Sequence, residues 1–222
     1  SPLMHHRDVG IVSFTGSTGV GRMVSEACAP AFKHCHLEMG GKNVIMVMDD
    51  AKLDLAVDGA IWGGFGTTGQ RCTASSRLIV TQGIHDRFVS ALISKIKTLK
   101  VDDALKEGTD IGPVVDPNQL QQDLRYIELG RKEGAKLIGG NRLEREKQGY
   151  YLEPALFLDS TPQMTINRDE IFGPVASVIR VKSYDEALAV ANDTPFGLSS
   201  CIATTSLKHA EHFKRNSAAG MV

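Results

Sequence analysis

Residues Gly63 to Ala74, Gly-Gly-Phe-Gly-Thr-Thr-Gly-Gln-Arg-Cys-Thr-Ala, place four glycines and a cation ahead of a single cysteine. Glycine lets a backbone approach another group closely and adopt positive φ, so Cys72 can lie at the floor of a narrow site. The thiolate is the nucleophilic form of cysteine, and a nearby cation such as Arg71 lowers the thiol pKa. Cys72 is therefore a candidate nucleophile. These residues alone leave open that Cys72 is a small buried apolar residue, as free cysteines commonly are.

Two glutamates also stand in glycine-containing contexts. Glu38 precedes Met39-Gly40-Gly41-Lys42, and Glu170 lies within Asp169-Glu170-Ile171-Phe172-Gly173-Pro174. Most glutamates are solvated surface residues, so neither segment assigns chemistry when it is taken singly.

The first element that could position such groups is a strand, turn and helix near the start of the chain. A β-branched and aromatic run, Val9 to Phe14, leads into Thr15-Gly16-Ser17-Thr18-Gly19-Val20-Gly21 and then into helix-compatible residues up to Ala29. Such a junction presents free backbone N–H groups and the positive end of a helix, which suits a phosphate. The glycine order is G-x-x-G-x-G, which differs from the dinucleotide fingerprint, so an ordinary turn explains these residues equally well.

The rest of the chain alternates short apolar runs with helical patterns. We expect strands at 44–48, 77–81, 135–138, 151–158, 175–181 and 198–203, and helices at 54–65, 85–99, 118–133, 184–192 and 207–216. Residues 100–117 are predicted to be irregular, and residues 139–149 to form a charged surface loop. The alternation predicts an α/β fold with a largely parallel sheet and flanking helices.

Composition limits the classes of partner. The chain has 222 residues and a formal net charge of -1, with basic residues spread along it, which predicts no nucleic acid and no membrane surface as partner. No apolar run approaches the roughly 20 residues of a membrane span, and the N-terminus lacks the apolar core of a signal peptide. We expect a cytoplasmic protein.

The four cysteines predict neither a metal site nor a disulfide framework, because they show no C-x-x-C spacing and are few for this chain length. Cys28, Cys35 and Cys201 are expected to be small interior residues. Both ends of the sequence look cut: a strand signal follows soon after Ser1, and Ala218 to Val222 stops where a further strand would begin. We expect a piece of a longer protein.

Four motifs in the same order resemble the aldehyde dehydrogenase superfamily. They are Phe14-Thr15-Gly16-Ser17, the Leu37–Lys42 segment with Glu38, Gly69-Gln70-Arg71-Cys72, and Glu170-Ile171-Phe172-Gly173-Pro174. Glu38 and Cys72 stand 34 positions apart, which is similar to the family's spacing. The resemblance covers essentially the whole chain. It implies that residues 1–42 are the C-terminal remnant of an NAD(P)-binding domain and that residues 43–222 are a catalytic domain, truncated at its C-terminal end.

The resemblance also implies roles for individual residues. Cys72 would be the catalytic nucleophile and Glu38 the general base. Five residues would hold NAD or NADP: Phe14, Gly16, Ser17, Glu170 and Phe172. Which of the two cofactors is used cannot be read from this sequence, since the segment that discriminates the ribose phosphate lies outside it.

The implied reaction explains why these residue types are needed. An aldehyde must form a tetrahedral adduct before hydride can leave, and a cysteine thiolate supplies it. The oxyanion of that adduct needs a donor, a role the resemblance gives to the Cys72 backbone N–H. A thioester remains, and Glu38 would activate water to hydrolyse it if partial burial raises its pKa toward neutrality. The presence of Glu38 favours release of a free acid over transfer to coenzyme A.

Residues 70–77 and 217–222 look most like semialdehyde dehydrogenases of sugar-acid catabolism, such as those for 2-oxoglutarate semialdehyde. Arg71 could bind the carboxylate of such an aldehyde, or it could pack against a carboxylate of the protein. The resemblance further implies a homodimeric or homotetrameric parent enzyme. Because this sequence lacks the earlier part of the family's cofactor domain, we expect the 222 residues alone to bind NAD poorly and to turn over little.

Two alternatives remain at this point. One is a non-catalytic interaction or structural domain, which replacement of Cys72 or Glu38 would have favoured; both residues are present. The other is a cysteine-dependent hydrolase. That function requires a histidine base near Cys72 in space, and none of the seven histidines stands in a recognisable motif.

Overall fold

The computed structural model describes residues 2–222, and Ser1 lies outside the described part. The chain forms two compact units, Ser1–Gly40 and Gly41–Val222. The division falls two residues before the sequence-based boundary at residue 42. Among residues 2–222 no helix is both long enough and apolar enough to cross a bilayer.

The first unit is a small parallel β-α-β arrangement. It comprises α1 (Pro2–His5), β1 (Ile11–Thr15), α2 (Thr18–Cys28), the 3-10 turn η1 (Ala29–Ala31) and β2 (His34–Glu38). Strands β1 and β2 pair in parallel, with Ile11 opposite His34 and Thr15 opposite Glu38. The predicted strand and helix are confirmed here. Strand β2 was not predicted, because His34–Glu38 lacks the β-branched and aromatic enrichment typical of strands.

The turn between β1 and α2 is set by local contacts. Ser17 caps α2, and its hydroxyl accepts a hydrogen bond from the Val20 N–H at 3.4 Å. A Cβ atom at Gly16 would lie 2.5 Å from the end of the Phe14 ring, so a larger residue at this position would require that ring to shift. The strand, turn and helix therefore form as the sequence indicates.

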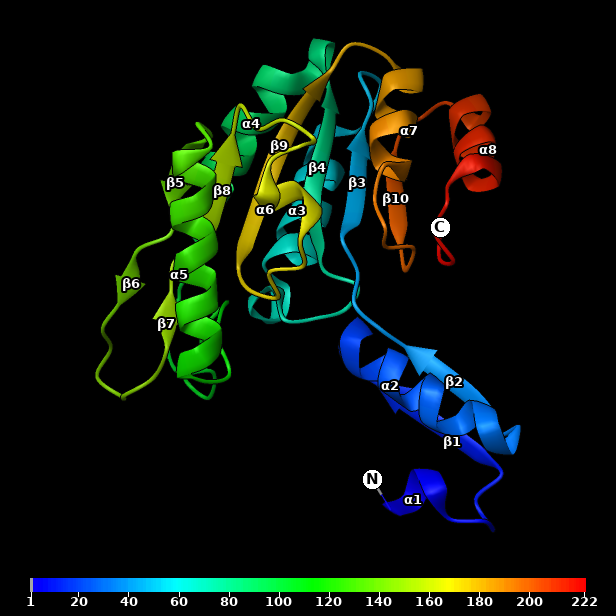
Figure 1. The fold of residues 1–222 in the computed structure, drawn as a ribbon. Helices are drawn as coiled ribbons and strands as arrows, with labels where there is room; N and C mark the ends of the chain where they lie inside the picture. The colour runs from blue at the N-terminus through cyan, green and yellow to red at the C-terminus, as the bar shows by residue number, and fades with distance from the viewer. Residues whose placement is uncertain (1) are drawn as a thin grey trace. The chain divides into compact units, whose positions relative to one another are not determined.

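The second unit is built on a six-stranded sheet in the order β10-β3-β4-β9-β8-β5 (Figure 1). The strands are β3 (Asn43–Val47), β4 (Ser75–Thr81), β5 (Lys136–Gly139), β8 (Ala155–Leu158), β9 (Val175–Val181) and β10 (Ser200–Ala203). Every neighbouring pair is parallel except β5 and β8, which are antiparallel. The predicted largely parallel sheet is confirmed.

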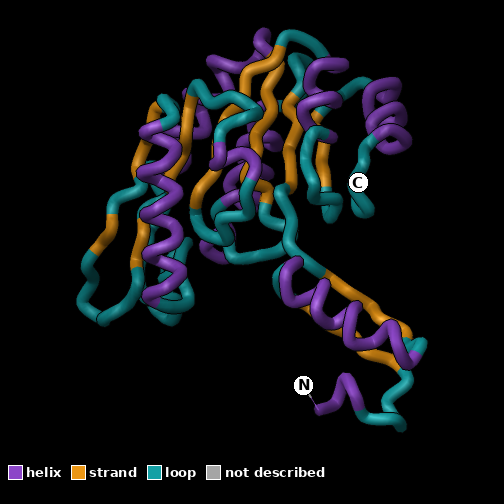
Figure 2. The backbone as a smooth tube through the Cα atoms, in the orientation of Figure 1, coloured by secondary structure: helices purple, strands orange, loops and turns teal. Residues whose placement is uncertain are grey.

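Helices cover both faces of this sheet, as Figure 2 shows. They are α3 (Leu53–Gly64), α4 (Gln82–Ile96), α5 (Pro117–Lys132), α6 (Thr165–Arg168), α7 (Tyr184–Asn192) and α8 (Leu207–Asn216). Helices α3 and α4 share a core with Val178 of β9, whereas the next residue, Ile179, packs on the opposite face with α7 and α8. This burial on both faces accounts for the continuous apolar runs in the strands.

Two sequence-based assignments were wrong in detail. The predicted strand 151–158 is two strands, β7 (Tyr151–Leu152) and β8, interrupted at Pro154, which has no N–H to donate to a ladder. The predicted surface loop 139–149 contains β6 (Arg142–Leu143), which pairs antiparallel with β7. The short helix α6 and the 3-10 turn η2 (Gly66–Gly69) were not predicted.

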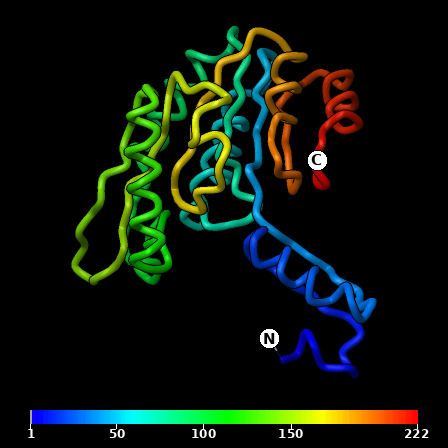
Figure 3. Tube along the Cα trace, viewed as in Figure 1, coloured from blue at the N-terminus to red at the C-terminus, as the bar shows by residue number. Residues whose placement is uncertain are grey.

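The direction of the strands gathers the predicted site segments of the second unit at one edge of the sheet. Strands β3, β4 and β9 run in parallel and so begin at the same edge (Figure 3). The segments that lead into them are residues 41–42, 70–74 and 170–174. We call this the amino edge of the sheet and the other the carboxyl edge.

The central strand gives a stability test. Leu78 of β4 is fully buried, so Leu78→Ala is expected to lower the free energy of unfolding by about 2 to 5 kcal/mol. The matched control is Leu55→Ala on α3, whose side chain is 67% exposed; its effect should stay within about 0.5 kcal/mol. Urea unfolding followed by the fluorescence of Trp62, the single tryptophan, reports on the second unit. Equal effects of the two substitutions would contradict the core assignment.

Candidate active site

Cys72 lies half-buried in the turn between η2 and β4. Its carbonyl oxygen accepts a hydrogen bond from Asn43 Nδ2 at 2.7 Å, and the same amide donates to the carbonyl of Ala74 at 3.0 Å. Asn43 Oδ1 in turn accepts from the Ser199 N–H at 3.0 Å. Asn43 is 2% exposed, so one buried amide holds the Cys72 turn against β3 and the start of β10.

Glycines allow the neighbouring segments to approach the cysteine turn. A Cβ atom on Gly41 would lie 2.5 Å from the Cys72 carbonyl oxygen. Gly69 has φ 65°, and a Cβ atom there would overlap the carbonyl oxygen of Gly173. Gly69, which directly precedes the cysteine turn, is therefore in backbone contact with the Glu170–Pro174 segment.

Two hydrogen-bond donors lie at Cys72: its own backbone N–H, which is free, and the Arg71 guanidinium, which is engaged. Among residues 2–222 the Cys72 backbone N–H has no acceptor, so it is available to an oxyanion. The exposed guanidinium of Arg71 donates from Nη2 to the Trp62 carbonyl at 2.6 Å. Arg71 makes no ion pair with any carboxylate of the described residues, so its packing partner is a backbone carbonyl.

Glu170 lies half-buried on the segment that leads into β9. Its Oε1 accepts a hydrogen bond from the Gly41 N–H at 2.9 Å, and its Oε2 receives none from the described residues. Burial raises the pKa of Glu170, partly offset by the Gly41 hydrogen bond and the charge of Lys42. Phe172, two residues on, has φ 64° and is 38% exposed. One oxygen of Glu170 is therefore left without a donor among the described residues.

Two buried cations lie behind this segment. Lys42 is 2% exposed, and its Nζ has no hydrogen-bond partner in the described chain. Burial, aided by the charge of Arg77, lowers the pKa of Lys42 to about 7, while Asp169 and Glu170 oppose the shift. Arg77 is fixed by donating to three carbonyls, those of Lys42, Val190 and Ala191, each at 3.0 Å.

The remaining predicted site residues belong to the first unit. Glu38 is the last residue of β2, and its carbonyl accepts from the Gly16 N–H at 3.0 Å, which ties it to the Phe14–Ser17 turn. Glu38 is exposed, so its own unit does not supply the partial burial expected from the sequence. The structure thus groups Glu38 with Phe14, Gly16 and Ser17, and Cys72 with Glu170 and Phe172. The pairing of Glu38 with Cys72 stays a prediction.

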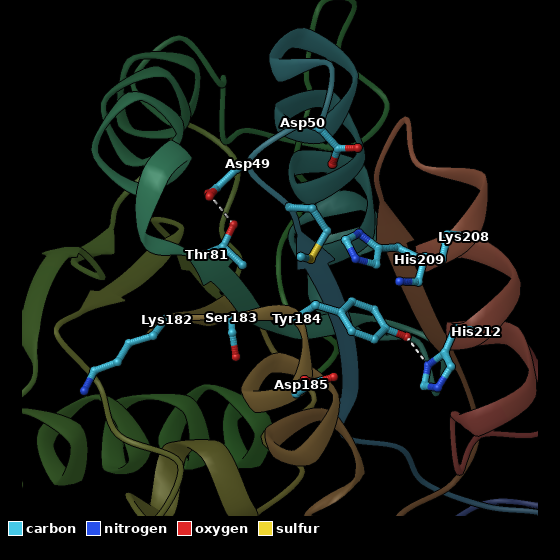
Figure 4. Close-up of a pocket in the computed structure, with 11 residues that line it drawn as sticks. Asp49, Asp50, Thr81, Lys182, Ser183, Tyr184, Asp185, Lys208, His209 and His212 are labelled. Atoms are coloured by element: carbon cyan, nitrogen blue, oxygen red, sulfur yellow. Dashed lines mark hydrogen bonds between the residues drawn. The ribbon is translucent and has the colours of Figure 1, made fainter.

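A hollow of the second unit lies at the carboxyl edge, away from Cys72. It has a volume of about 710 Å³ and is bordered by α7 and α8 (Figure 4). In it Tyr184 stacks on His209 and hydrogen-bonds His212 Nδ1 at 2.8 Å. The carboxylate of Asp50 is already bonded by Thr204 and Thr205. No cysteine lines this hollow, so it offers no thiol chemistry.

The histidines of the second unit bear on the hydrolase alternative. His85 lies in the first turn of α4, directly after β4, and His209 and His212 lie on α8, after β10. All three therefore stand at or beyond the carboxyl edge, opposite the Cys72 turn. A histidine base for Cys72 is absent from residues 41–222, which disfavours a cysteine-dependent hydrolase built on this unit.

The other cysteines differ in burial. Cys28 is buried as expected, and Cys35 is half-buried. Cys201 is exposed, so the expectation of an interior residue was wrong for it. The reason is topological, because β10 is the outer strand of the sheet and one of its faces is incompletely covered.

Sequence reasoning missed several residues that shape the site. Asn43 directly precedes the predicted apolar strand 44–48 and was given no role. A polar residue at the start of a buried strand nevertheless indicates a hydrogen-bonding role. Asp123 lies on the buried stripe of α5 and is fully buried, a placement that a lone acid in an apolar stripe could have indicated. Lys42 was noted only as part of a motif.

Comparison with known proteins places the chain in a family. The model of the aldehyde dehydrogenase family matches residues 1–222. An alpha-ketoglutaric semialdehyde dehydrogenase of Bacillus subtilis (strain 168) is 46% identical over 223 residues, covering 99% of this chain and 46% of that protein. A betaine aldehyde dehydrogenase of Rhizobium leguminosarum is 43% identical, covering 94% of this chain and 43% of that protein.

A solved structure agrees. The betaine aldehyde dehydrogenase of Staphylococcus aureus in complex with NAD+ superposes with a TM-score of 0.95 at 33% identity, covering 99% of this chain and 44% of that one. The chain belongs to the aldehyde dehydrogenase family. It spans slightly less than half the length of the relatives it matches.

Thiol reactivity tests the assignment of Cys72. With iodoacetamide at pH 7, we expect Cys72 to be alkylated before the other three cysteines. Cys28 is buried, and the neighbouring Cys28 thiol raises the pKa of Cys35. The Cys201 residue is exposed overall, but the protein around its sulfur raises its thiol pKa by burial.

The measurement is peptide mapping by mass spectrometry over a time course. The matched control is Cys201→Ser, which should leave the labelling rate of Cys72 unchanged. Faster labelling of Cys35 or Cys201 than of Cys72 would count against Cys72 as the nucleophile.

Proposed function

We propose that the chain is part of an NAD(P)-dependent aldehyde dehydrogenase that oxidises an aldehyde to a free carboxylic acid through Cys72. The observation that carries the proposal is the amino edge. There the Cys72 turn has an unengaged backbone N–H, and Gly69, directly before that turn, is in backbone contact with the segment that bears Glu170. Membership of the aldehyde dehydrogenase family supports the reaction class.

The residues would divide the reaction as follows. The Cys72 thiolate forms a bond to the aldehyde carbon, and the Cys72 N–H donates to the oxyanion of the resulting hemithioacetal. The nicotinamide cofactor, when bound, accepts the hydride. Glu38 then takes a proton from water, which attacks the thioester on Cys72 and releases the acid and the thiolate.

The residues present fit the cofactor at two places. Glu170 keeps one carboxylate oxygen free of protein donors, as a ribose hydroxyl requires, and Phe172 is exposed beside it. In the first unit the Phe14–Ser17 turn opens the 11-residue helix α2, whose N-terminus suits a phosphate. The NAD+-bound relative supports NAD; the choice between NAD and NADP is left to experiment.

A semialdehyde that bears a carboxylate is the proposed substrate class. The support is the similarity to an alpha-ketoglutaric semialdehyde dehydrogenase together with the exposed guanidinium of Arg71, which is adjacent to Cys72 and pairs with no acid among residues 2–222. A cytoplasmic location and a homodimeric or homotetrameric assembly remain predictions. We expect little turnover from these 222 residues alone.

The general base gives a kinetic test in the full-length gene product that carries this chain. Glu38→Gln removes deacylation and spares hydride transfer, so we expect one equivalent of NADH per Cys72 in a burst, followed by turnover slowed at least 100-fold. Stopped-flow absorbance at the NADH band measures both phases. Cys72→Ala should abolish the burst, and Glu128→Gln, an exposed glutamate on α5, should change neither phase. Loss of the burst in Glu38→Gln would refute separate roles for the two residues.

The role of Arg71 gives a specificity test. Arg71→Ala should raise KM at least tenfold for aldehydes that carry a carboxylate, because the loss of a charged hydrogen bond costs about 1.5 to 3 kcal/mol. Neutral aldehydes of equal length should change less than threefold. An aldehyde panel with NAD and with NADP measures both series, with Arg131→Ala as the exposed control. Equal losses for both series would show that Arg71 only supports the turn through Trp62.

A further inference from the structure

Helix α5 holds the Glu170–Pro174 segment from behind. Gln119 Nε2 and Gln122 Nε2 both donate to the Ile171 carbonyl, at 3.0 and 2.8 Å. Tyr126 OH donates to Asp169 Oδ2 at 2.9 Å. The segment that bears Glu170 therefore depends on α5 for its position.

Asp123 is the buried centre of this contact. Its side chain is 0% exposed, and Oδ1 accepts from Gln119 Nε2 at 2.7 Å, so Asp123 also orients one of the amides that bond Ile171. A Cβ atom on Gly173 would overlap the Asp123 carboxyl, which shows that the carboxyl lies directly against the Gly173 backbone. Asp123 thus touches the segment both through Gln119 and by packing.

The Asp123 carboxyl has no charge partner. Its Oδ2 has no donor among the described residues, and it takes part in no ion pair. The titratable groups on the facing segment are Asp169 and Glu170, both acids. Helix α5 itself carries Arg125, which packs over Tyr126, the Tyr126 phenol, and the exposed, mutually ion-paired Glu128, Arg131 and Lys132 toward its C-terminal end. We call the arrangement in which the segment packs on Asp123 closed. Because a buried carboxylate without a cation is costly, this closed arrangement favours the neutral acid form of Asp123.

We propose that Asp123 is a positioning residue. Its neutral carboxyl packs on Gly173 and holds the Glu170–Pro174 segment in the closed arrangement, in which Glu170 can bind a ligand. When the segment moves away, water reaches the carboxyl and the charged form becomes accessible. The effect of Asp123 on cofactor binding rests on the proposed function. The effect of Asp123 on the position of the Glu170–Pro174 segment does not.

The direction of the pH effect follows from linkage. Burial raises the pKa of Asp123 to about 7 in the closed state, and an opened, hydrated aspartate has an ordinary pKa near 4. The stabilisation of the closed state is therefore fully present below about pH 4 and is lost progressively up to about pH 7. Between these limits the opening equilibrium rises by up to tenfold for each pH unit.

Three amides report on this opening because their acceptors belong to the segment. The Gly41 N–H bonds Glu170 Oε1, the Val175 N–H bonds the Gly173 carbonyl, and the Ala155 N–H bonds the Pro174 carbonyl. Their hydrogen exchange can be followed by NMR in the 222-residue chain without any cofactor. Amides of the β3–β4 ladder serve as the internal reference.

The test compares the wild-type chain with Asp123→Asn at equal pH, so that intrinsic exchange rates cancel. We expect the ratio of wild-type to variant exchange at the three amides to rise at least tenfold, and at most about 100-fold, from pH 5 to pH 7. Asp123→Leu, also neutral at every pH, should give the same trend if the asparagine variant fails to fold. Glu128→Gln, on the exposed part of the same helix, should follow the wild type.

A ratio that does not change with pH, or a Glu128→Gln variant that behaves like Asp123→Asn, would overturn the proposal. A second readout is NAD affinity of the full-length gene product, which should weaken from pH 5.5 to 7 in the wild type more than in Asp123→Asn. An exchange effect without any NAD binding would uphold the positioning role and contradict the proposed cofactor. NAD binding with no exchange effect would contradict the positioning role and uphold the proposed cofactor.

Discussion

The amino edge of the second unit depends on steric room at three glycines. Gly41 lies against the Cys72 carbonyl, Gly69 against the Gly173 carbonyl, and Gly173 against the Asp123 carboxyl. At each position a Cβ atom would collide with backbone or with a buried side chain, and Gly69 also needs positive φ. These contacts let three segments that are distant in sequence meet where their parallel strands begin.

Polar groups then fix the positions of the segments that the glycines allow to meet. Asn43 binds the Cys72 and Ala74 carbonyls together with the Ser199 N–H, and Gly41 anchors Glu170. Buried amides of this kind are costly to leave unsatisfied, so they specify one arrangement of the turn. The result is a cysteine with a free backbone donor beside a carboxylate with a free oxygen. In many parallel α/β sheets the ligand binds at the carboxyl edge, where this unit has a hollow of about 710 Å³, whereas Cys72 lies at the other edge.

The sequence predicted the elements well wherever a long pattern existed. Helix α8 and strand β9 match their predicted ranges, because an amphipathic or apolar run was bounded by clear breaks. Strand β2 and the division of β7 from β8 were missed, since short strands are decided by pairing partners that no local pattern reveals. The motifs identified Cys72 and Glu170 as candidates, and the structure brings their segments into contact. Asn43 and Asp123 were missed because their roles come from contacts with residues distant in sequence, Cys72 for Asn43 and Gly173 for Asp123.

The most direct test of the account is to locate the acyl group during turnover. The full-length gene product is mixed with a semialdehyde and NAD, quenched in acid within milliseconds, and mapped by peptide mass spectrometry. The account predicts an adduct with the mass of the acyl thioester on the peptide that contains Cys72, matching the NADH formed. NADH formation with that peptide unmodified, or with the acyl group on another residue, would contradict it.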